Sequence, residues 1–136
     1  MKRKKNFLAI TITIAGLATF ARPGFVEAQQ AGTKRTELQR HDLSVPGREV
    51  IQARVEIEPG FSFPGHWHPG EEIIYVLEGH LEYKIGNRPP VTLKAGDVLY
   101  IASGAIHSAK NAGAVKAAEL ATYIVEKGKP LITIIK

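Results

Sequence analysis

Residues 60–79 read GFSFPGHWHPGEEIIYVLEG. Within seven residues this stretch holds His66, His68 and Glu72. In an extended strand, side chains two residues apart lie on the same face, so His66 and His68 can present their imidazoles to one ion. The Pro-Gly pair that follows permits a turn, which can bring Glu72 to the same ion. Three ligands leave coordination positions to fill, and His107 is the clearest supplier elsewhere in the chain. The pattern therefore predicts a metal site.

The absence of cysteine limits what such a site can contain. With no thiolate available, any ion must be held by nitrogen and oxygen atoms. The two remaining histidines, His41 and His80, lie in a polar segment and after a turn glycine, and we interpret both as surface residues. Glu71 adjoins Glu72, but strand alternation directs it to the opposite face, so it is the weaker candidate ligand.

The first 28 residues have the pattern of a secretory signal peptide. A basic start, KRKK, precedes an apolar run over residues 7–21, and the segment ends in small Ala28 with Val26 two positions before it. The run of 15 residues is shorter than the roughly 20 that a membrane-spanning helix needs, so an uncleaved anchor is the weaker alternative. We predict cleavage after Ala28 and a periplasmic or secreted protein, residues 29–136, with no membrane contact afterwards.

The formal net charge of +5 comes mainly from this leader. Residues 1–28 hold five basic residues against one acidic residue, whereas the rest of the chain holds 13 against 12 and so carries about +1. A nearly neutral mature chain gives no electrostatic argument for a nucleic-acid partner. Its length suits one domain with a core of its own.

The mature chain divides into a polar segment and a series of short strands. Residues 29–47 hold few apolar side chains, and we interpret them as an N-terminal arm or a weak first strand. A barrel domain is predicted for residues 48–136. Within it, alternation of apolar and polar residues predicts a strand over residues 50–58 with one face in a core. The other predicted strands cover residues 73–77, 81–85, 91–94, 98–101, 105–108, most of 114–125 and 131–135.

Glycine and proline punctuate these strands at roughly the 8-to-12-residue spacing of an all-β sandwich or barrel. Residues 73–77, IIYVL, are apolar at every position, which predicts a strand buried between two layers. Residues 114–121 have helix-forming composition, but the β-rich context favours a strand there. Four aromatic residues can line a pocket or fill the core, and Tyr83 is the best candidate for the pocket. The other three are Phe61, Phe63 and Tyr100.

Two motifs make the chain resemble the cupin superfamily. The first, G-x5-H-x-H-x3-E-x6-G, is matched at every position by Gly60, His66, His68, Glu72 and Gly79. The second, G-x5-P-x-G-x2-H-x3-N, is matched by Gly96, Gly104, His107 and Asn111, with Ala102 in place of the usual proline. This departure affects a turn and leaves the set of metal ligands complete.

The resemblance implies an all-β fold, a double-stranded β-helix or jelly-roll barrel. It also implies that His66, His68, Glu72 and His107 hold a metal ion inside the barrel. The ion would be one divalent transition metal, and nitrogen and oxygen ligands suit Mn, Fe, Ni, Cu or Zn. Cupins are commonly dimers, so a homodimer is expected, formed through the polar arm or residues 131–135.

The resemblance also suggests a function. The leading prediction is an exported, metal-dependent oxidoreductase of the dioxygenase type that acts on a small organic substrate. Glu72 is the predicted catalytic residue, because it can stay bound to the ion or shift to accept a proton. The alternatives are a non-enzymatic protein that binds a metal or a small ligand, a cupin isomerase or lyase, and a barrel that its metal only stabilises.

Overall fold

The computed structural model describes residues 30–135, and in this range every regular element is a β-strand. The all-β prediction is therefore confirmed. The predicted signal peptide, residues 1–28, and its cleavage site lie outside the described residues. Within the described range, no helix is long and apolar enough to cross a membrane. The ten strands are β1 (Thr33–Asp42), β2 (Arg48–Ile57), β3 (Ser62–Trp67), β4 (Gly70–Glu78), β5 (His80–Ile85), β6 (Val91–Lys94), β7 (Val98–Ile101), β8 (His107–Lys110), β9 (Ala117–Glu126) and β10 (Thr133–Ile134).

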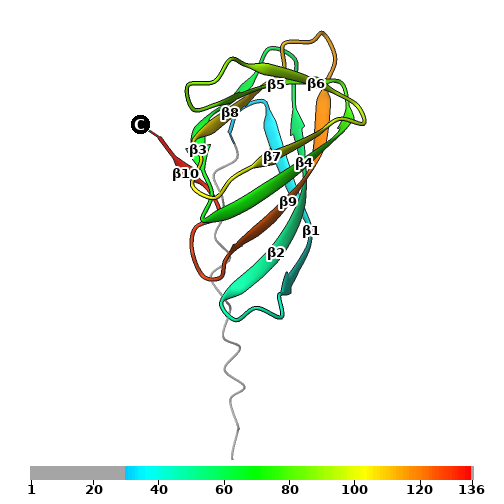
Figure 1. Ribbon diagram of the computed structural model, residues 1–136. Coiled ribbons are helices and arrows are strands. Elements are labelled where there is room, and N and C mark those ends of the chain that lie inside the picture. Colours follow the sequence, from blue (N-terminus) through cyan, green and yellow to red (C-terminus); the bar gives the residue numbers. More distant parts are fainter. Residues whose placement is uncertain (1–29, 136) are drawn as a thin grey trace, which may run out of the picture.

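The strands form two antiparallel five-stranded sheets that pack against each other, as Figure 1 shows. The first sheet has the order β1-β2-β9-β4-β7 and the second the order β10-β3-β8-β5-β6. Apart from the consecutive pairs β1-β2 and β5-β6, neighbours within each sheet come from distant parts of the sequence, so the chain crosses repeatedly between the two layers. This arrangement is the predicted jelly roll.

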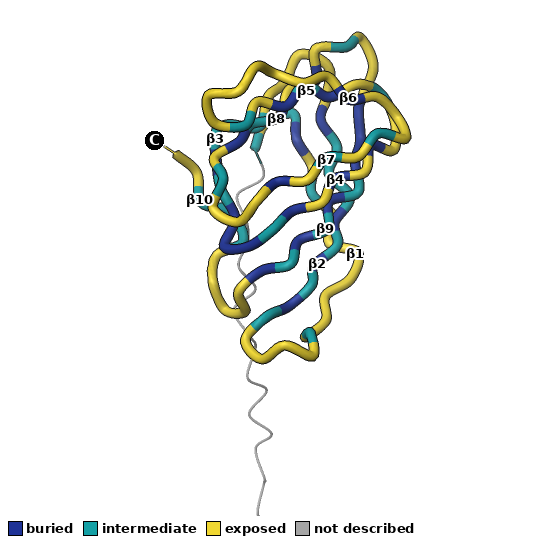
Figure 2. The backbone as a smooth tube through the Cα atoms, in the orientation of Figure 1, coloured by how far each residue is buried: buried dark blue, intermediate teal, exposed yellow. Residues whose placement is uncertain are grey.

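The core lies between the two sheets, where each strand turns one face inward. Buried residues alternate with more exposed ones along the strands, and Figure 2 shows this alternation clearly in β2, β9 and β4. The interior contains two apolar clusters. The larger is centred on Ile57, Ile74, Val76, Leu81 and Ile101, and the smaller on Ile51, Ala53, Ala121, Tyr123 and Val125. Burial of these side chains supplies the main driving force for folding.

Residues 29–47 were predicted to be an N-terminal arm or a weak first strand, and the structure contains the strand, β1. β1 pairs with β2 along its whole length, from Thr33 opposite Ile57 to Asp42 opposite Glu49. The strand lies at the edge of its sheet and is largely exposed, which explains why its sequence is polar. Near its beginning, Thr33 and Arg35 line the interior cavity described below.

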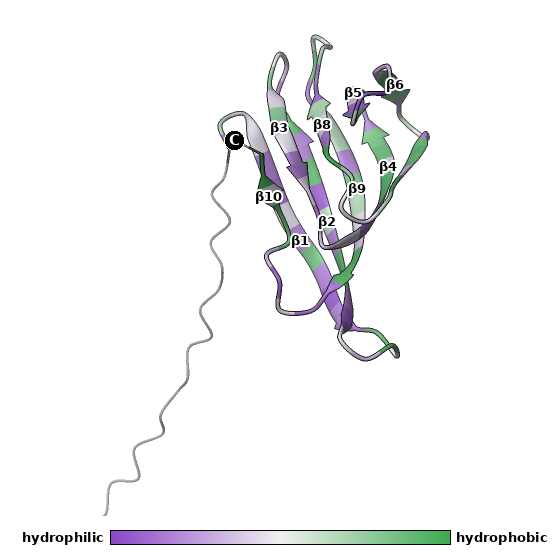
Figure 3. Cartoon of the chain, turned by 60° about the vertical axis from the view of Figure 1, so that its left-hand side comes forward, coloured by the Kyte–Doolittle hydropathy of each residue, from purple (hydrophilic) through white to green (hydrophobic). Residues whose placement is uncertain are grey.

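The predicted burial of residues 73–77 on both faces is wrong. Glu72, Ile74 and Val76 are buried, whereas Ile73 and Tyr75 between them are 42% and 45% exposed. Residues 73–77 are apolar at every position, and Figure 3 shows β4 coloured as hydrophobic over much of its length, but only the inner face has a second layer to cover it. Two of the four predicted pocket or core aromatics are also exposed, Phe61 and Tyr100.

Glycines allow two close approaches that shape the site. At Gly70, a Cβ atom would lie 2.1 Å from the backbone oxygen of Ile124, so β4 and β9 can come this close only without a side chain there. Gly79, the last glycine of the first motif, has a φ of +73° and ends β4 against Ala117. The contact at Gly70 holds β4 against β9 at a point two residues before Glu72.

Candidate metal centre

Three strands bring the four predicted ligands into one place. His66 lies on β3 and His107 on β8, and the two residues are directly paired in the sheet. His68 follows the end of β3, and Glu72 points inward from β4 of the other sheet. All four residues are buried, with exposed fractions of 6% or less. The two motifs therefore meet across the interior of the barrel.

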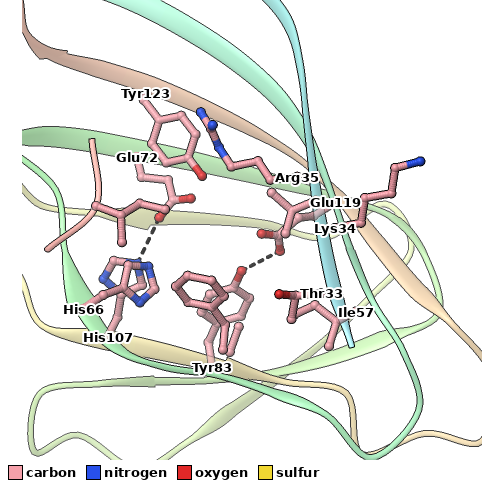
Figure 4. A pocket seen from close by; sticks show the side chains of 14 residues that line it. Thr33, Lys34, Arg35, Ile57, His66, Glu72, Tyr83, His107, Glu119 and Tyr123 are labelled. Carbon is pink, nitrogen blue, oxygen red and sulfur yellow. Dashed lines mark hydrogen bonds and ion pairs between the residues drawn. The ribbon is translucent and has the colours of Figure 1, made fainter. Parts of the chain in front are cut away.

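The reactive atoms of these residues are close enough to share one ion. One ring nitrogen from each of His66, His68 and His107 lies within 4.8 Å of the others. Glu72 Oε2 lies 3.3 Å from His68 Nε2 and 3.1 Å from His107 Nε2. Figure 4 shows the Glu72 carboxylate pointing toward the imidazoles of His66 and His107. We call these four residues the metal cluster.

Backbone carbonyls fix the orientation of each imidazole. The Nδ1–H groups of His66, His68 and His107 donate to the carbonyl oxygens of Pro64, Leu131 and Ala105, at 2.8, 2.6 and 2.9 Å. A carbonyl oxygen can only accept, so Nδ1 carries the hydrogen and Nε2 presents its lone pair to the cluster. Such outer hydrogen bonds are typical of histidines that bind metals.

Three atoms at the centre of the cluster are buried without a hydrogen-bond partner in the described part of the chain. They are His68 Nε2, Glu72 Oε2 and His107 Nε2. Buried polar atoms of this kind are costly, and here lone pairs and a negative charge face one another. A cation between them would turn these contacts from repulsive to attractive. The cluster therefore fits a metal ion bound by three imidazole nitrogens and one carboxylate oxygen.

The electrostatics favour the protonation states that metal binding requires. Burial raises the pKa of Glu72, but hydrogen bonds from proton-bearing His107 and His68, in which a proton takes the place of an ion, outweigh burial and lower the pKa to about 2. Burial, with repulsion from His107, lowers the pKa of His66 to about 4. At neutral pH the carboxylate is therefore ionised and the His66 imidazole is neutral.

The other candidate ligands lie outside the cluster. Glu71 points away from the interior, and its carboxylate lies 3.9 Å from the guanidinium of Arg48. His41 and His80 are exposed on β1 and at the start of β5. Asn111 of the second motif is fully buried, and its side-chain amide donates to the carbonyl oxygens of Ile57 and Val115. That asparagine therefore joins a loop to β2.

A cavity of about 40 Å³ adjoins the metal cluster. This volume is at the small end for a ligand pocket. Tyr83 and Phe63, two of the predicted pocket candidates, line it. Sequence reasoning missed several other polar residues that line it, among them Arg35, Glu119 and Tyr123. The Tyr123 ring packs against His68, with ring centroids 4.8 Å apart, and the Arg35 guanidinium lies 5.5 Å from the Tyr123 centroid.

One of these missed residues had a visible signal. In β9 the inward positions are Ala117, Glu119, Ala121, Tyr123 and Val125. A glutamate at an inward position of an otherwise apolar alternation is unusual, and such a position points to a functional or paired carboxyl group. Arg35 had no comparable signal, because the strand that carries it is polar nearly throughout.

Comparison with known proteins identifies the family. The family model described as "Cupin domain" matches residues 53–126, more than half of the chain, and includes all four members of the metal cluster. The chain is a cupin. The resemblance predicted from the two motifs is therefore confirmed.

One curated relative of this cupin is named for oxalate. The oxalate-binding protein of Thermotoga maritima is 40% identical over 74 residues, which cover 54% of this chain and 60% of that protein. A germin-like protein of Arabidopsis thaliana, subfamily 2 member 1, is 32% identical over 89 residues, covering 60% of this chain and 41% of its own length. This cupin thus spans less than two thirds of either relative.

Solved structures give a similar picture. An oxalate oxidase structure matches with a TM-score of 0.63 and 28% identity, over 79% of this chain and 57% of that one. The DMSP lyase DddQ from Ruegeria pomeroyi matches with a TM-score of 0.57 and 25% identity, over 62% of this chain and 42% of that one. The fold thus occurs in proteins with different reactions, so the function must be argued from the site.

Proposed function

We propose that this cupin holds one divalent transition-metal ion in the metal cluster and acts there on a small carboxylate, such as oxalate, as an oxidoreductase of the dioxygenase type. The observation that carries the proposal is the set of buried, unpartnered atoms on His68, Glu72 and His107. A cation would satisfy all three atoms, and a small cavity lies beside them. A bound ion would supply Lewis-acid and redox chemistry at a coordinated ligand.

The residues around the cavity account for the class of ligand. The cavity of about 40 Å³ is small, which suits a small dicarboxylate. Arg35 lines the same space and would attract a negatively charged ligand. The names of the oxalate-binding protein and the oxalate oxidase support the same class.

In this proposal Glu72 serves to bind the ion. A carboxylate whose pKa is about 2 stays ionised at neutral pH, as a ligand must, and it is a weak base. Its role as the proton acceptor of the reaction stays a prediction. Glu72→Gln separates the two roles, because loss of binding removes metal, whereas loss of a base leaves metal content unchanged and lowers only the rate.

The second candidate is a cupin that binds a small carboxylate without transforming it. Two observations favour it: the cavity is small, and the oxalate-binding protein of Thermotoga maritima is 40% identical over the matched segment. The two candidates share the metal cluster and differ only in turnover.

The experiment compares chelator-treated protein with protein reconstituted with Mn, Fe, Ni, Cu or Zn, each with oxalate present. Oxygen uptake and CO2 release that chelation abolishes would support the oxidoreductase. Oxalate binding by calorimetry without product would support the binding protein. Protein that binds metal but neither binds nor transforms oxalate would be a barrel that its metal only stabilises. Protein that takes up none of the five metals would overturn the proposal.

Two further parts of the proposal concern the whole protein. We propose export with cleavage after Ala28, which N-terminal sequencing of the mature protein would test, since Gln29 is the expected first residue. We also propose a homodimer, which sedimentation velocity would test. Both segments suggested for the dimer contact pair within their own chain, β1 with β2 and β10 with β3.

A further inference from the structure

A second carboxyl group lies in the same cavity, and the proposed function has not used it. Glu119 on β9 is 3% exposed and lines the cavity together with His66, Glu72 and His107. In Figure 4 its carboxyl group lies on the other side of the pocket from the two histidines. A ligand at the metal cluster would therefore lie between the cluster and Glu119.

The carboxyl group has one fixed partner. The hydroxyl of Tyr83, which is itself 2% exposed, donates to Glu119 Oε2 at 2.5 Å. On the neighbouring strands, Glu119 stands opposite Val55 of β2 and Val76 of β4, which are both apolar. The hydrogen bond from Tyr83 therefore fixes one carboxyl oxygen within a largely apolar part of the wall.

The surroundings favour the protonated form of this group. Burial, followed by repulsion from the Glu72 carboxylate, raises the pKa of Glu119 to about 8, although the Tyr83 hydrogen bond lowers it. A cation in the metal cluster would offset the repulsion from Glu72, but burial would remain. Besides Tyr83, the titratable or charged residues around the same cavity are Lys34 and Arg35 on β1, His66 on β3, Glu72 on β4, His107 on β8 and Tyr123 on β9.

We propose that Glu119 is the acid–base residue of the cavity, donating its proton to an oxygen atom of the carboxylate held at the metal cluster while Tyr83 fixes its carboxyl group. The proposal rests on the proposed function for the identity of the ligand. In the transfer the O–H bond of Glu119 breaks and an O–H bond forms on the ligand. The ligand thereby loses one negative charge, Glu119 gains it, and no electrons change hands. The Tyr83 hydroxyl then stabilises the Glu119 carboxylate, and solvent returns the proton after the product leaves.

A purely structural role would leave a different signature. If Glu119 and Tyr83 only fill the core, then Glu119→Gln keeps their size and one hydrogen bond, and the cavity should behave as before. If Glu119 carries the proton, the amide can hold the ligand but cannot transfer a proton. General acid–base groups typically contribute about 100-fold or more to a rate.

The first test needs no turnover. Difference infrared spectra of the full mature chain, metal-free and metal-loaded, are recorded between about pH 6 and about pH 10, across the raised pKa of the carboxyl group. We expect the carbonyl band of a protonated carboxylic acid to disappear with rising pH in the wild type and to be missing in Glu119→Gln. Glu119→Asp, which keeps the carboxyl group, should retain a band and serves if the glutamine variant does not fold. A wild-type spectrum without such a band would overturn the inference.

The second test uses oxalate with metal-loaded protein of equal metal content. Glu119→Gln should lower kcat about 100-fold with little change in KM, and Tyr83→Phe should retain turnover with a shifted pH profile. In a protein that only binds oxalate, affinity should fall as pH rises through the titration of Glu119 and become flat in Glu119→Gln. Unchanged kcat, affinity and pH profile in Glu119→Gln would overturn the inference. A wild type that neither binds nor transforms oxalate overturns the proposed function instead, and the infrared band then still decides whether Glu119 holds a proton.

Discussion

The cavity has two walls, and they are encoded in different ways. One wall is the metal cluster, whose members come from residues 66–72 and from His107 directly opposite His66. The rest of the polar lining includes Arg35, Tyr83, Glu119 and Tyr123, which come from β1, β5 and β9, and Tyr123 adjoins Glu72 and His68 of the metal cluster. We call this second group the β9 wall. Two motifs of fixed spacing supply the first wall, whereas no motif links the residues of the second. The two walls should therefore respond differently to mutation, metal removal and pH.

The largest expected difference is in metal content. His66→Ala or His107→Ala should lower the bound metal of the purified mature protein severalfold, because each removes an imidazole from the cluster. Variants of the β9 wall, such as Glu119→Gln, should keep their metal. Elemental analysis measures all of them. His41→Ala and His80→Ala are matched controls on exposed histidines, and equal metal content in all the histidine variants would contradict the ligand assignment.

The second-largest expected effect is the loss of thermal stability when the metal is removed. A ligand present at about 100 times its dissociation constant stabilises the folded state by about 2.7 kcal/mol. For a domain of this size we therefore expect a chelator to lower the melting temperature by on the order of 10 °C. Calorimetry or circular dichroism would measure the shift. The same chelator should have little effect on His66→Ala, and an equal shift in that variant would place the metal elsewhere.

The β9 wall should make stability depend on pH in the metal-free protein. The pKa of Glu119 is about 8 when folded, against 4.5 for an ordinary glutamate, so between these values only the folded chain keeps the proton. Unfolding in this pH range therefore releases a proton, so raising the pH favours unfolding. The stabilising contribution is thus present below about pH 4.5 and lost as the pH rises through about 8.

Urea unfolding of chelator-treated wild type and Glu119→Gln at both ends of this range measures the effect. The wild type should lose stability relative to the variant as the pH rises. A difference between the two proteins that does not change with pH would show that Glu119 is not titrating in this range.

The smallest expected effect concerns the partner of Glu119. Tyr83→Phe removes one buried hydrogen bond and should lower the free energy of unfolding by about 1 kcal/mol. Because that hydrogen bond lowers the pKa of Glu119, the variant should raise this pKa further. Urea unfolding and infrared titration would report the two effects. Metal content should not change, and a loss of metal here would mean that the two walls are not independent.

The contrast between the walls also explains what could be predicted from sequence. The all-β class followed from alternation, and the convergence of His66, His68, Glu72 and His107 was implied by the resemblance of two motifs to the cupin superfamily. Glu119 and Arg35 could not be placed in this way, because their position depends on the order in which distant strands pair within a sheet. The predicted burial of Ile73 and Tyr75 was wrong because apolar composition does not show whether a second layer covers a strand.

The central claim is that three imidazoles and one carboxylate bind a single cation inside the barrel. Nitrogen-15 NMR of histidine-labelled protein during a zinc titration tests it most directly, because zinc is diamagnetic and each imidazole is observed separately. We predict that the Nε2 signals of His66, His68 and His107 shift together and saturate at one equivalent, with Nδ1 protonated throughout. The signals of His41 and His80 should stay in place. Shifts confined to those two exposed histidines, or none that saturates, would contradict the account.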